Sequence, residues 1–151
     1  MLKKAYWIVT GLAALAFYTG TATAATKNYE VFDGYTVYYN AFTSDTLQPN
    51  MAKANGITRS KKRGLLSVSV VKKSFSPAGT PVNVTLKAKA TNLTGQLKQI
   101  TIREVEDAGS IYYLSEFPIT HREVLDFTLD VTPKGESKPL VVKFRQQFYT
   151  E

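Results

Sequence analysis

The sequence predicts an all-β domain, built as an antiparallel two-sheet sandwich of immunoglobulin-like kind. Three observations support this prediction: apolar and polar residues alternate along several segments, turns containing Gly or Pro separate those segments, and the connections are short. Strict alternation places successive side chains on opposite faces of a strand, and short connections make neighbouring strands antiparallel. About seven strands of even length favour a sandwich, with a closed barrel as the second alternative.

The strands are expected where the alternation holds, and it is clearest from residue 82 to residue 91, where Val82, Val84 and Leu86 begin a dry face. The inward side chains are expected to be Leu66, Val68 and Val70 in the second strand, and Ile100 and Ile102 in the fourth. In chain order, the expected strands are residues 35–42, 65–73, 82–91, 97–105, 111–117, 124–131 and 140–149. The sequence contains no cysteine, so sheet hydrogen bonds and apolar burial must hold this fold together without disulfides.

One long connection, residues 43–63, separates the first two strands and carries a short helix. Pro49 stands at the first helical position and Gly56 just past the end, which is the usual placement of these two residues. A helix of about two turns is marginal alone. We therefore expect Met51, with Leu47 or Ile57, to pack against an end of the sandwich. Long connections of this kind often carry function.

The N-terminal segment Met1–Ala24 has the features of a secretory signal peptide. Lys3 and Lys4 form a positive start, Ala5–Tyr18 is an apolar run, and Ala22–Ala24 offers small residues for cleavage. An uncleaved membrane anchor is the alternative, but it needs about 20 apolar residues and this run is shorter. We expect cleavage near Ala24, a single domain over residues 25–151, no stable membrane anchor, and the periplasm of a Gram-negative bacterium as the location.

Several segments carry a resemblance to a known protein family. They are YYNAF (residues 38–42), the helix that begins at Pro49, GITRSK (56–61), ATNLTGQ (90–96), IYYLSEF (111–117) and QQFY (146–149). On these segments, in order and with matching spacing, the chain resembles a family of small exported bacterial proteins classified as a domain of unknown function. The resemblance implies an exported location and brings no established activity or catalytic residues.

The sequence shows no catalytic constellation, and we expect no catalytic residue, no metal site and no cofactor. His121 is the only histidine and is expected in an exposed turn. A nucleophilic hydrolase needs a base with an orienting group, and a zinc site needs several Cys or His ligands. Glu104 and Glu106 share one strand face and could form the carboxylate pair of a glycosidase. The nearby Arg103 and Lys98 favour ion pairs across strands instead.

A basic cluster at the start of the second strand is the most distinctive charged feature. Residues 59–63 read Arg-Ser-Lys-Lys-Arg, and such a cluster attracts phosphate or carboxylate groups. An anionic envelope component or the acidic surface of an envelope protein would fit, whereas nucleic acid is not expected outside the cytoplasm. The alternative is a solvated segment that protects a sheet edge from aggregation. We predict that neutralising Arg59, Lys61, Lys62 and Arg63 together abolishes partner capture and leaves thermal stability nearly unchanged.

Aromatic residues form a second cluster along the first strand. Because side chains alternate, Tyr38 and Phe42 must point to the face opposite Tyr35 and Tyr39. An exposed tyrosine beside a basic loop suits recognition, although packing between the sheets is the commoner use of such rings. The candidate binding site therefore comprises Tyr38, Asn40, Phe42, Arg59, Lys61, Lys62 and Arg63.

The leading hypothesis is a non-enzymatic binding or accessory protein of the cell envelope. One alternative is a small hydrolase of envelope polymers that uses Glu104, Glu106 or Glu116. Another is a small-ligand carrier, which would need an apolar cavity of at least about 300 Å³ between the sheets.

Overall fold

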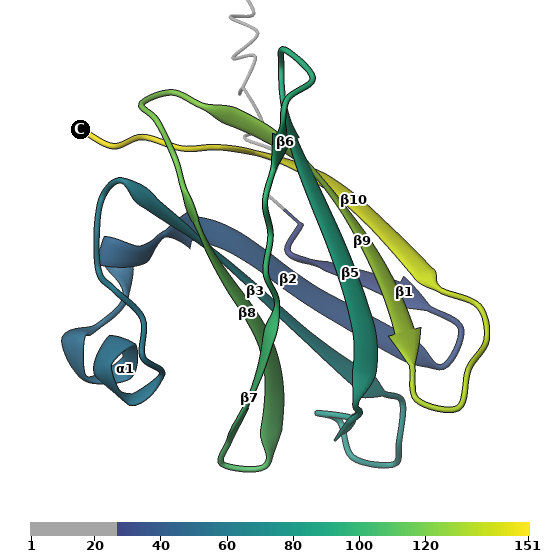
Figure 1. The fold of residues 1–151 in the computed structure, drawn as a ribbon. Coiled ribbons are helices and arrows are strands. Elements are labelled where there is room, and N and C mark those ends of the chain that lie inside the picture. Colours follow the sequence, from purple (N-terminus) through teal and green to yellow (C-terminus); the bar gives the residue numbers. More distant parts are fainter. Residues whose placement is uncertain (1–26) are drawn as a thin grey trace, which may run out of the picture.

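A computed structural model describes residues 27–151, and within them two antiparallel sheets face each other (Figure 1). The predicted signal peptide, residues 1–24, lies outside the described residues. The two-sheet sandwich is confirmed. Its strands are β1 (Tyr29–Phe32), β2 (Tyr35–Thr43), β3 (Arg63–Lys72), β4 (Thr80–Pro81), β5 (Val84–Asn92), β6 (Leu97–Lys98), β7 (Arg103–Asp107), β8 (Ser110–Pro118), β9 (Val124–Pro133) and β10 (Leu140–Gln147). Among residues 27–151 no helix is long and apolar enough to cross a membrane.

The strand order places β2 and β3 side by side in the sheet that carries the long connection. Sheet A has the order β1-β2-β3-β8-β7, with β4 paired to the end of β3, and sheet B has the order β10-β9-β5-β6. With the short strands β1, β4 and β6 set aside, β2-β3-β8-β7 facing β10-β9-β5 is the strand order of a constant-type immunoglobulin domain.

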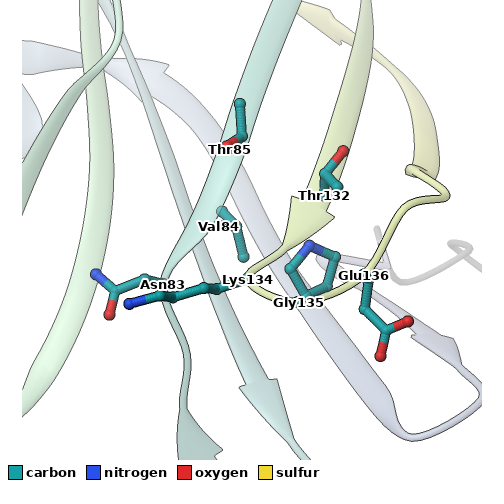
Figure 2. Close-up of a pocket in the computed structure, with 8 residues that line it drawn as sticks. Asn83, Val84, Thr85, Thr132, Lys134, Gly135 and Glu136 are labelled. Atoms are coloured by element: carbon teal, nitrogen blue, oxygen red, sulfur yellow. The ribbon is translucent and has the colours of Figure 1, made fainter.

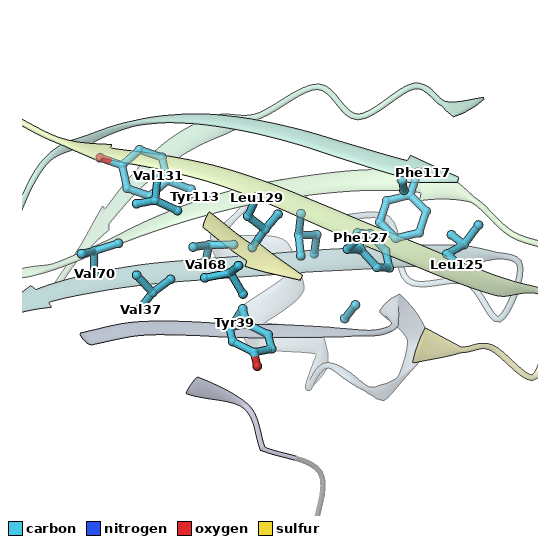
Figure 3. Packing of buried hydrophobic residues seen from close by; sticks show 14 of the residues in the cluster. Val37, Tyr39, Val68, Val70, Tyr113, Phe117, Leu125, Phe127, Leu129 and Val131 are labelled. Atoms are coloured by element: carbon cyan, nitrogen blue, oxygen red, sulfur yellow. The ribbon is translucent and has the colours of Figure 1, made fainter. Parts of the chain in front are cut away.

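The core fills the space between the sheets with alternate residues of both inner faces (Figure 3). Leu66, Val68 and Val70 are buried, as the alternation predicts. Stacked aromatic rings close one side of the core. The centroid of the Phe144 ring lies 4.6 Å from that of Tyr39 and 4.8 Å from that of Phe127. The sandwich is therefore held by apolar contacts across the two sheets and by the hydrogen bonds within each sheet.

The prediction of a single strand over residues 97–105 is wrong. Leu97–Lys98 pairs with β5 in sheet B, whereas Arg103–Asp107 pairs with β8 in sheet A, and residues 99–102 cross between the sheets. Ile100 and Ile102 still pack against the core during this crossing. The alternation therefore predicts correctly that these two side chains are buried, but it does not indicate a continuous strand.

The short strands β1 and β4 were not among the expected strands. In β1, Tyr29 pairs with Tyr38 of β2. In β4, Thr80 pairs with Lys72 at the end of β3. Both strands extend sheet A with only a few residues, too short for alternation to be recognised.

The predicted helix is present as α1 (Pro49–Ala54), and the 3-10 turn η1 (Ser44–Thr46) precedes it. Its packing differs from the expectation. Ala52 is the buried helical residue, while Met51 is 49% exposed. Together with Ile57, Ala52 packs on the outer face of sheet A, and not against an end of the sandwich. The connection folds this way because Leu65 of β3 and Leu114 of β8 present an apolar outer face on which Ala52 and Ile57 are buried.

Candidate binding site

A second, smaller core lies between α1 and the outer face of sheet A. Ala52 and Ile57 of the connection contact Leu65 of β3 and Leu114 of β8, and all four side chains are buried. Leu65 and its neighbour Leu66 point to opposite faces, so β3 is buried on both sides here. The helix thus converts part of an outer face into an apolar site.

An apolar pocket opens beside this second core, and we call it the α1 pocket. Its volume is about 160 Å³, and its apolar lining comes from Phe42, Leu47, Met51, Ile57, Leu65 and Leu114. Asn55, Ser67, Asp107 and Tyr112 supply the polar groups of the lining. An apolar protein cavity of about 150 Å³ binds benzene. The α1 pocket therefore has the size for one aromatic ring or one branched aliphatic side chain.

Polar side chains continue the site along β2 and β3. Tyr38, Asn40 and Phe42 lie on the outer face, opposite Ser69, Ser67 and Leu65 respectively. Ser67 lines both the α1 pocket and a second hollow of about 200 Å³, which Tyr38, Asn40 and Ser69 also line. The structure thus brings Tyr38, Asn40 and Phe42 together in one surface, and we call the second hollow the outer-face trough.

The four cations of the basic cluster have two different roles. Arg59 donates hydrogen bonds to the carbonyl oxygens of Leu47 (2.7 Å) and Asp45 (2.8 Å), so it holds the connection together. Arg63 lies 3.5 Å from Glu116. Lys61 and Lys62, in contrast, are exposed, and neither forms an ion pair within residues 27–151. The expectation that all four cations can be neutralised without a structural effect therefore needs correction for Arg59 and Arg63.

Ser44 fixes the path of the connection from inside. Its side chain is fully buried, and its hydroxyl lies 2.7 Å from the Thr58 carbonyl and accepts the Ser60 N–H at 3.0 Å. Glu116 of β8 accepts the Thr58 N–H at 3.0 Å. Buried hydrogen bonds of this kind are costly to lose. Lys61 and Lys62 are thus displayed from an anchored loop, next to the end of β2.

The carboxylates considered for hydrolysis do not converge. Glu104 and Glu106 lie on one face of β7, opposite Tyr113 and Ile111 of β8, while Glu116 points to the other face of sheet A. Neither Glu104 nor Glu106 lines the α1 pocket or the outer-face trough.

The ion pairs expected for these glutamates are also wrong. Lys98 pairs with Glu123 at 2.8 Å, and Arg103 donates to the Asn55 carbonyl at the end of α1. Glu104 instead accepts a hydrogen bond from Asn83. Arg103 was expected to form an ion pair across strands, but it ties β7 to the helical connection instead.

His121 lies in the predicted turn but is half-buried and not exposed, because its Nδ1 accepts the Thr150 N–H at 3.2 Å and its ring contacts Tyr149. This bond fixes the orientation of the imidazole against the C-terminal segment. Within residues 27–151, no group of three or more His, Cys, Asp or Glu side chains is placed to hold a metal ion.

A polar hollow of about 340 Å³ lies at one end of the sandwich (Figure 2). Asn83 and Lys134 lie on one side of it and Glu136 on the other, at the start of β5 and the end of β9. Glu136 accepts a 3.0 Å hydrogen bond from the Tyr35 hydroxyl, and burial together with this carboxylate raises the pKa of Tyr35. The hollow has a polar lining and lies at the surface, so it does not match the apolar inter-sheet cavity of a carrier.

The sequence identified Phe42 as a residue of the site, but it did not identify Met51 as an exposed residue of the pocket lining, nor Leu65, Leu114 and Asp107. A signal was present for the two leucines. The apolar pairs Leu65-Leu66 and Tyr113-Leu114 interrupt the alternation, which indicates strands that are buried on both faces.

Comparisons with known proteins give one family and several solved structures of the same fold. A family model described as "Domain of unknown function (DUF4426)" matches residues 29–151. No curated protein is significantly similar. A DUF4426 family protein from Pseudomonas aeruginosa with a known crystal structure is 36% identical in sequence to this chain. The two structures match with a TM-score of 0.70, and the match covers 82% of this chain and 94% of that chain.

FetP from uropathogenic Escherichia coli, recombinantly expressed in the periplasm, is similar in fold alone, with 11% identity, a TM-score of 0.57 and coverage of 80% of this chain and 92% of that chain. A copper-bound FetP variant gives 10% identity, a TM-score of 0.56, and coverage of 80% and 93%. The family match spans the whole sandwich, and the chain belongs to the DUF4426 family of proteins with a domain of unknown function.

Proposed function

We propose that this chain is an exported, non-enzymatic binding protein of the bacterial cell envelope, which holds a polypeptide partner at the outer face of sheet A. The α1 pocket is the observation that carries the proposal. The signal-peptide features of Met1–Ala24 support export. The fold shared with FetP, a protein expressed in the periplasm, is compatible with the same compartment.

The pocket favours an anchor side chain over a free small molecule. Its volume of about 160 Å³ is below the range of about 300 to 1,000 Å³ that is typical of small-molecule sites. In protein interfaces, a few large side chains buried in such pockets supply most of the binding energy. One aromatic or branched aliphatic residue of a partner fits both the size and the apolar lining.

The outer-face trough favours an extended polypeptide next to that anchor. Tyr38, Asn40 and Phe42 follow one another at two-residue spacing on β2, which corresponds to about 7 Å between side chains. Alternate side chains of an extended partner segment repeat at the same distance. Asn40, Ser67 and the Tyr38 hydroxyl offer hydrogen-bond donors and acceptors to its backbone. We therefore assign the trough to the residues that flank the anchor.

Charge favours an acidic flank on the partner. Lys61 and Lys62 are exposed beside the end of β2, and exposed charges at the rim of an interface mainly accelerate association with a complementary surface. An acidic segment next to the apolar anchor is attracted to this side of the site. Arg59 contributes by holding the loop that displays the two lysines.

A pocket-filling substitution is expected to block this site. Ser67→Phe places a ring where the α1 pocket and the outer-face trough meet, so we expect at least about a tenfold loss of partner capture with the fold intact. The matched control is Thr128→Phe, which adds the same ring at the centre of β9, between Lys89 and Lys143 of the neighbouring strands. Tagged proteins purified from intact cells after crosslinking give the measurement.

The proposal requires a set of partners that is enriched with the unmodified protein, retained by Thr128→Phe and lost by Ser67→Phe. Circular dichroism and thermal unfolding of the two variants report whether each is folded. Equal capture by a folded Ser67→Phe protein would reject the α1 pocket as the site.

A further inference from the structure

One aromatic side chain is far more exposed than any other large apolar residue of the described chain. Phe75 has an exposed fraction of 111%, and the next values are 72% for Leu97 and 67% for Leu93. Phe75 lies in the loop between β3 and β4, at the end of sheet A away from the start of β3. The ring of Phe75 gains nothing from the fold of its own chain, so all of its apolar area is free to contact another molecule or a surface.

The loop that carries Phe75 is firmly built. Lys73 donates its N–H to the Gly34 carbonyl at 2.9 Å, which ties the base of the loop to the β1–β2 turn. Gly79 donates to the Ser76 carbonyl at 3.0 Å and adopts a positive φ of 72°, where a Cβ atom would lie 2.9 Å from the Lys72 carbonyl oxygen. Phe75 is therefore exposed from an ordered hairpin, so contact through this loop does not require its backbone to fold.

The surroundings of Phe75 are positively charged. Lys72 and Lys73 precede it, and the β9–β10 loop at the same end carries Lys134 and Lys138 (Figure 1). The bond from Tyr35 to Glu136 links that loop to the β1–β2 turn, and so to the base of the Phe75 loop. Asp33 and Glu136 are the acidic residues of these three connections, and Asp107 borders the β7–β8 turn at the same end, so four lysines stand against three carboxylates.

We propose that this end of the sandwich is a peripheral docking surface for an anionic lipid bilayer, with Phe75 inserted among the headgroups. One apolar group alone binds a bilayer only marginally, and stable attachment needs a second signal, such as basic residues. Lysines near a membrane surface supply that signal through attraction to anionic lipids. Phe75 and the surrounding lysines provide the two signals together.

A bilayer suits this surface better than a folded protein partner. The direct neighbours of Phe75 are Ser74 and Ser76, so no ring of apolar contacts surrounds the aromatic group as in a protein hot spot. The lysines stand on two separate connections, and a fluid layer of headgroups accommodates them without matched shape. Docking here also leaves the α1 pocket free, because Ser67, the β3 residue of the pocket nearest this end, lies five residues or about 17 Å before the end of the strand.

Vesicle binding tests the proposal directly. The exported protein is mixed with vesicles of phosphatidylethanolamine and phosphatidylglycerol, or of phosphatidylcholine alone, and the bound fraction is measured by sedimentation. We expect binding to the anionic vesicles that falls at high salt, with at least about tenfold weaker binding to the neutral ones. Phe75→Ser is expected to weaken binding to anionic vesicles about tenfold.

The matched control is Leu93→Ser, an exposed apolar residue in the β5–β6 hairpin, which is expected to bind as the unmodified protein does. Absence of binding to anionic vesicles would overturn the proposal, and so would equal binding by Phe75→Ser. Loss of partner capture by Phe75→Ser without any vesicle binding would assign Phe75 to a protein contact instead. None of these outcomes depends on the α1 pocket, so this test and that of Ser67→Phe can fail separately.

Discussion

Replacement of Phe127 by alanine is expected to lower the free energy of unfolding by about 3 to 5 kcal/mol. The Phe127 ring is almost fully buried, and its centroid lies 4.8 Å from that of Phe144 and 5.8 Å from that of Phe117. Removing it takes apolar area from the core and leaves a cavity that the strands on either side cannot close. In a protein without disulfides, this loss removes a large part of the total stability.

Urea unfolding with linear extrapolation gives the free energy for each variant. Phe75→Ala is the matched control, because it removes the same side chain from a fully exposed position and is expected to change stability by no more than about 0.5 kcal/mol. A loss below about 1 kcal/mol for Phe127→Ala would show that the two sheets do not pack around this ring.

The second large effect is expected at Gly64, which lies directly opposite Phe117 in the β3–β8 pair. A Cβ atom at Gly64 would overlap the Phe117 ring, because it would lie only 2.7 Å from Cζ of Phe117. Phe117 is held by Phe127 and Phe148, each with its ring centroid 5.8 Å away, so it cannot move aside freely. Gly64→Ala is therefore expected to destabilise the protein by about 1 to 3 kcal/mol, and Gly64→Val by more.

A double variant separates this overlap from a general effect of glycine replacement. Phe117→Leu removes the ring edge that the new Cβ atom would meet, so the cost of Gly64→Ala should be smaller in that background than in the unmodified protein. The difference is measured as the coupling free energy of a double-mutant cycle. Strictly additive effects would contradict the direct clash between Gly64 and Phe117.

The fold was predictable from the sequence to the extent that burial follows strand alternation. Long strands such as β5 and β9 repeat apolar and polar residues strictly, and one face of each lies on the core. The same pattern failed at residues 97–105, because Ile100 and Ile102 are packed against the core while the backbone changes sheets. Alternation reports which side chains are buried, whereas sheet membership depends on hydrogen bonds to distant strands.

The site was predictable only on the side that β2 supplies. The opposite orientation of Tyr38 and Tyr39 follows from geometry alone, and the structure has Tyr39 buried and Tyr38 exposed. The place of α1 could not be predicted in the same way. Its six residues form a helix for local reasons, but its position depends on the apolar outer face that Leu65 and Leu114 present from different strands.

The roles of Arg59 and Arg63 were hidden for a similar reason. Four neighbouring cations look equivalent in a sequence, yet the turn at Ser44 directs Arg59 toward two backbone carbonyl groups and β8 offers Glu116 to Arg63. Of these four cations, Lys61 and Lys62 are the two whose side chains form neither an ion pair nor a hydrogen bond in the described part of the chain, and both are exposed.

Site-specific photo-crosslinking in intact cells tests the central claim, that a polypeptide partner occupies the outer face of sheet A. A photoreactive amino acid replaces Met51 at the lip of the α1 pocket or, as the control, Lys143 on the outer face of sheet B. The account predicts a discrete protein adduct from position 51 that disappears when Ser67→Phe is added, and no such adduct from position 143. No adduct from position 51, or the same adduct from both positions, would contradict it.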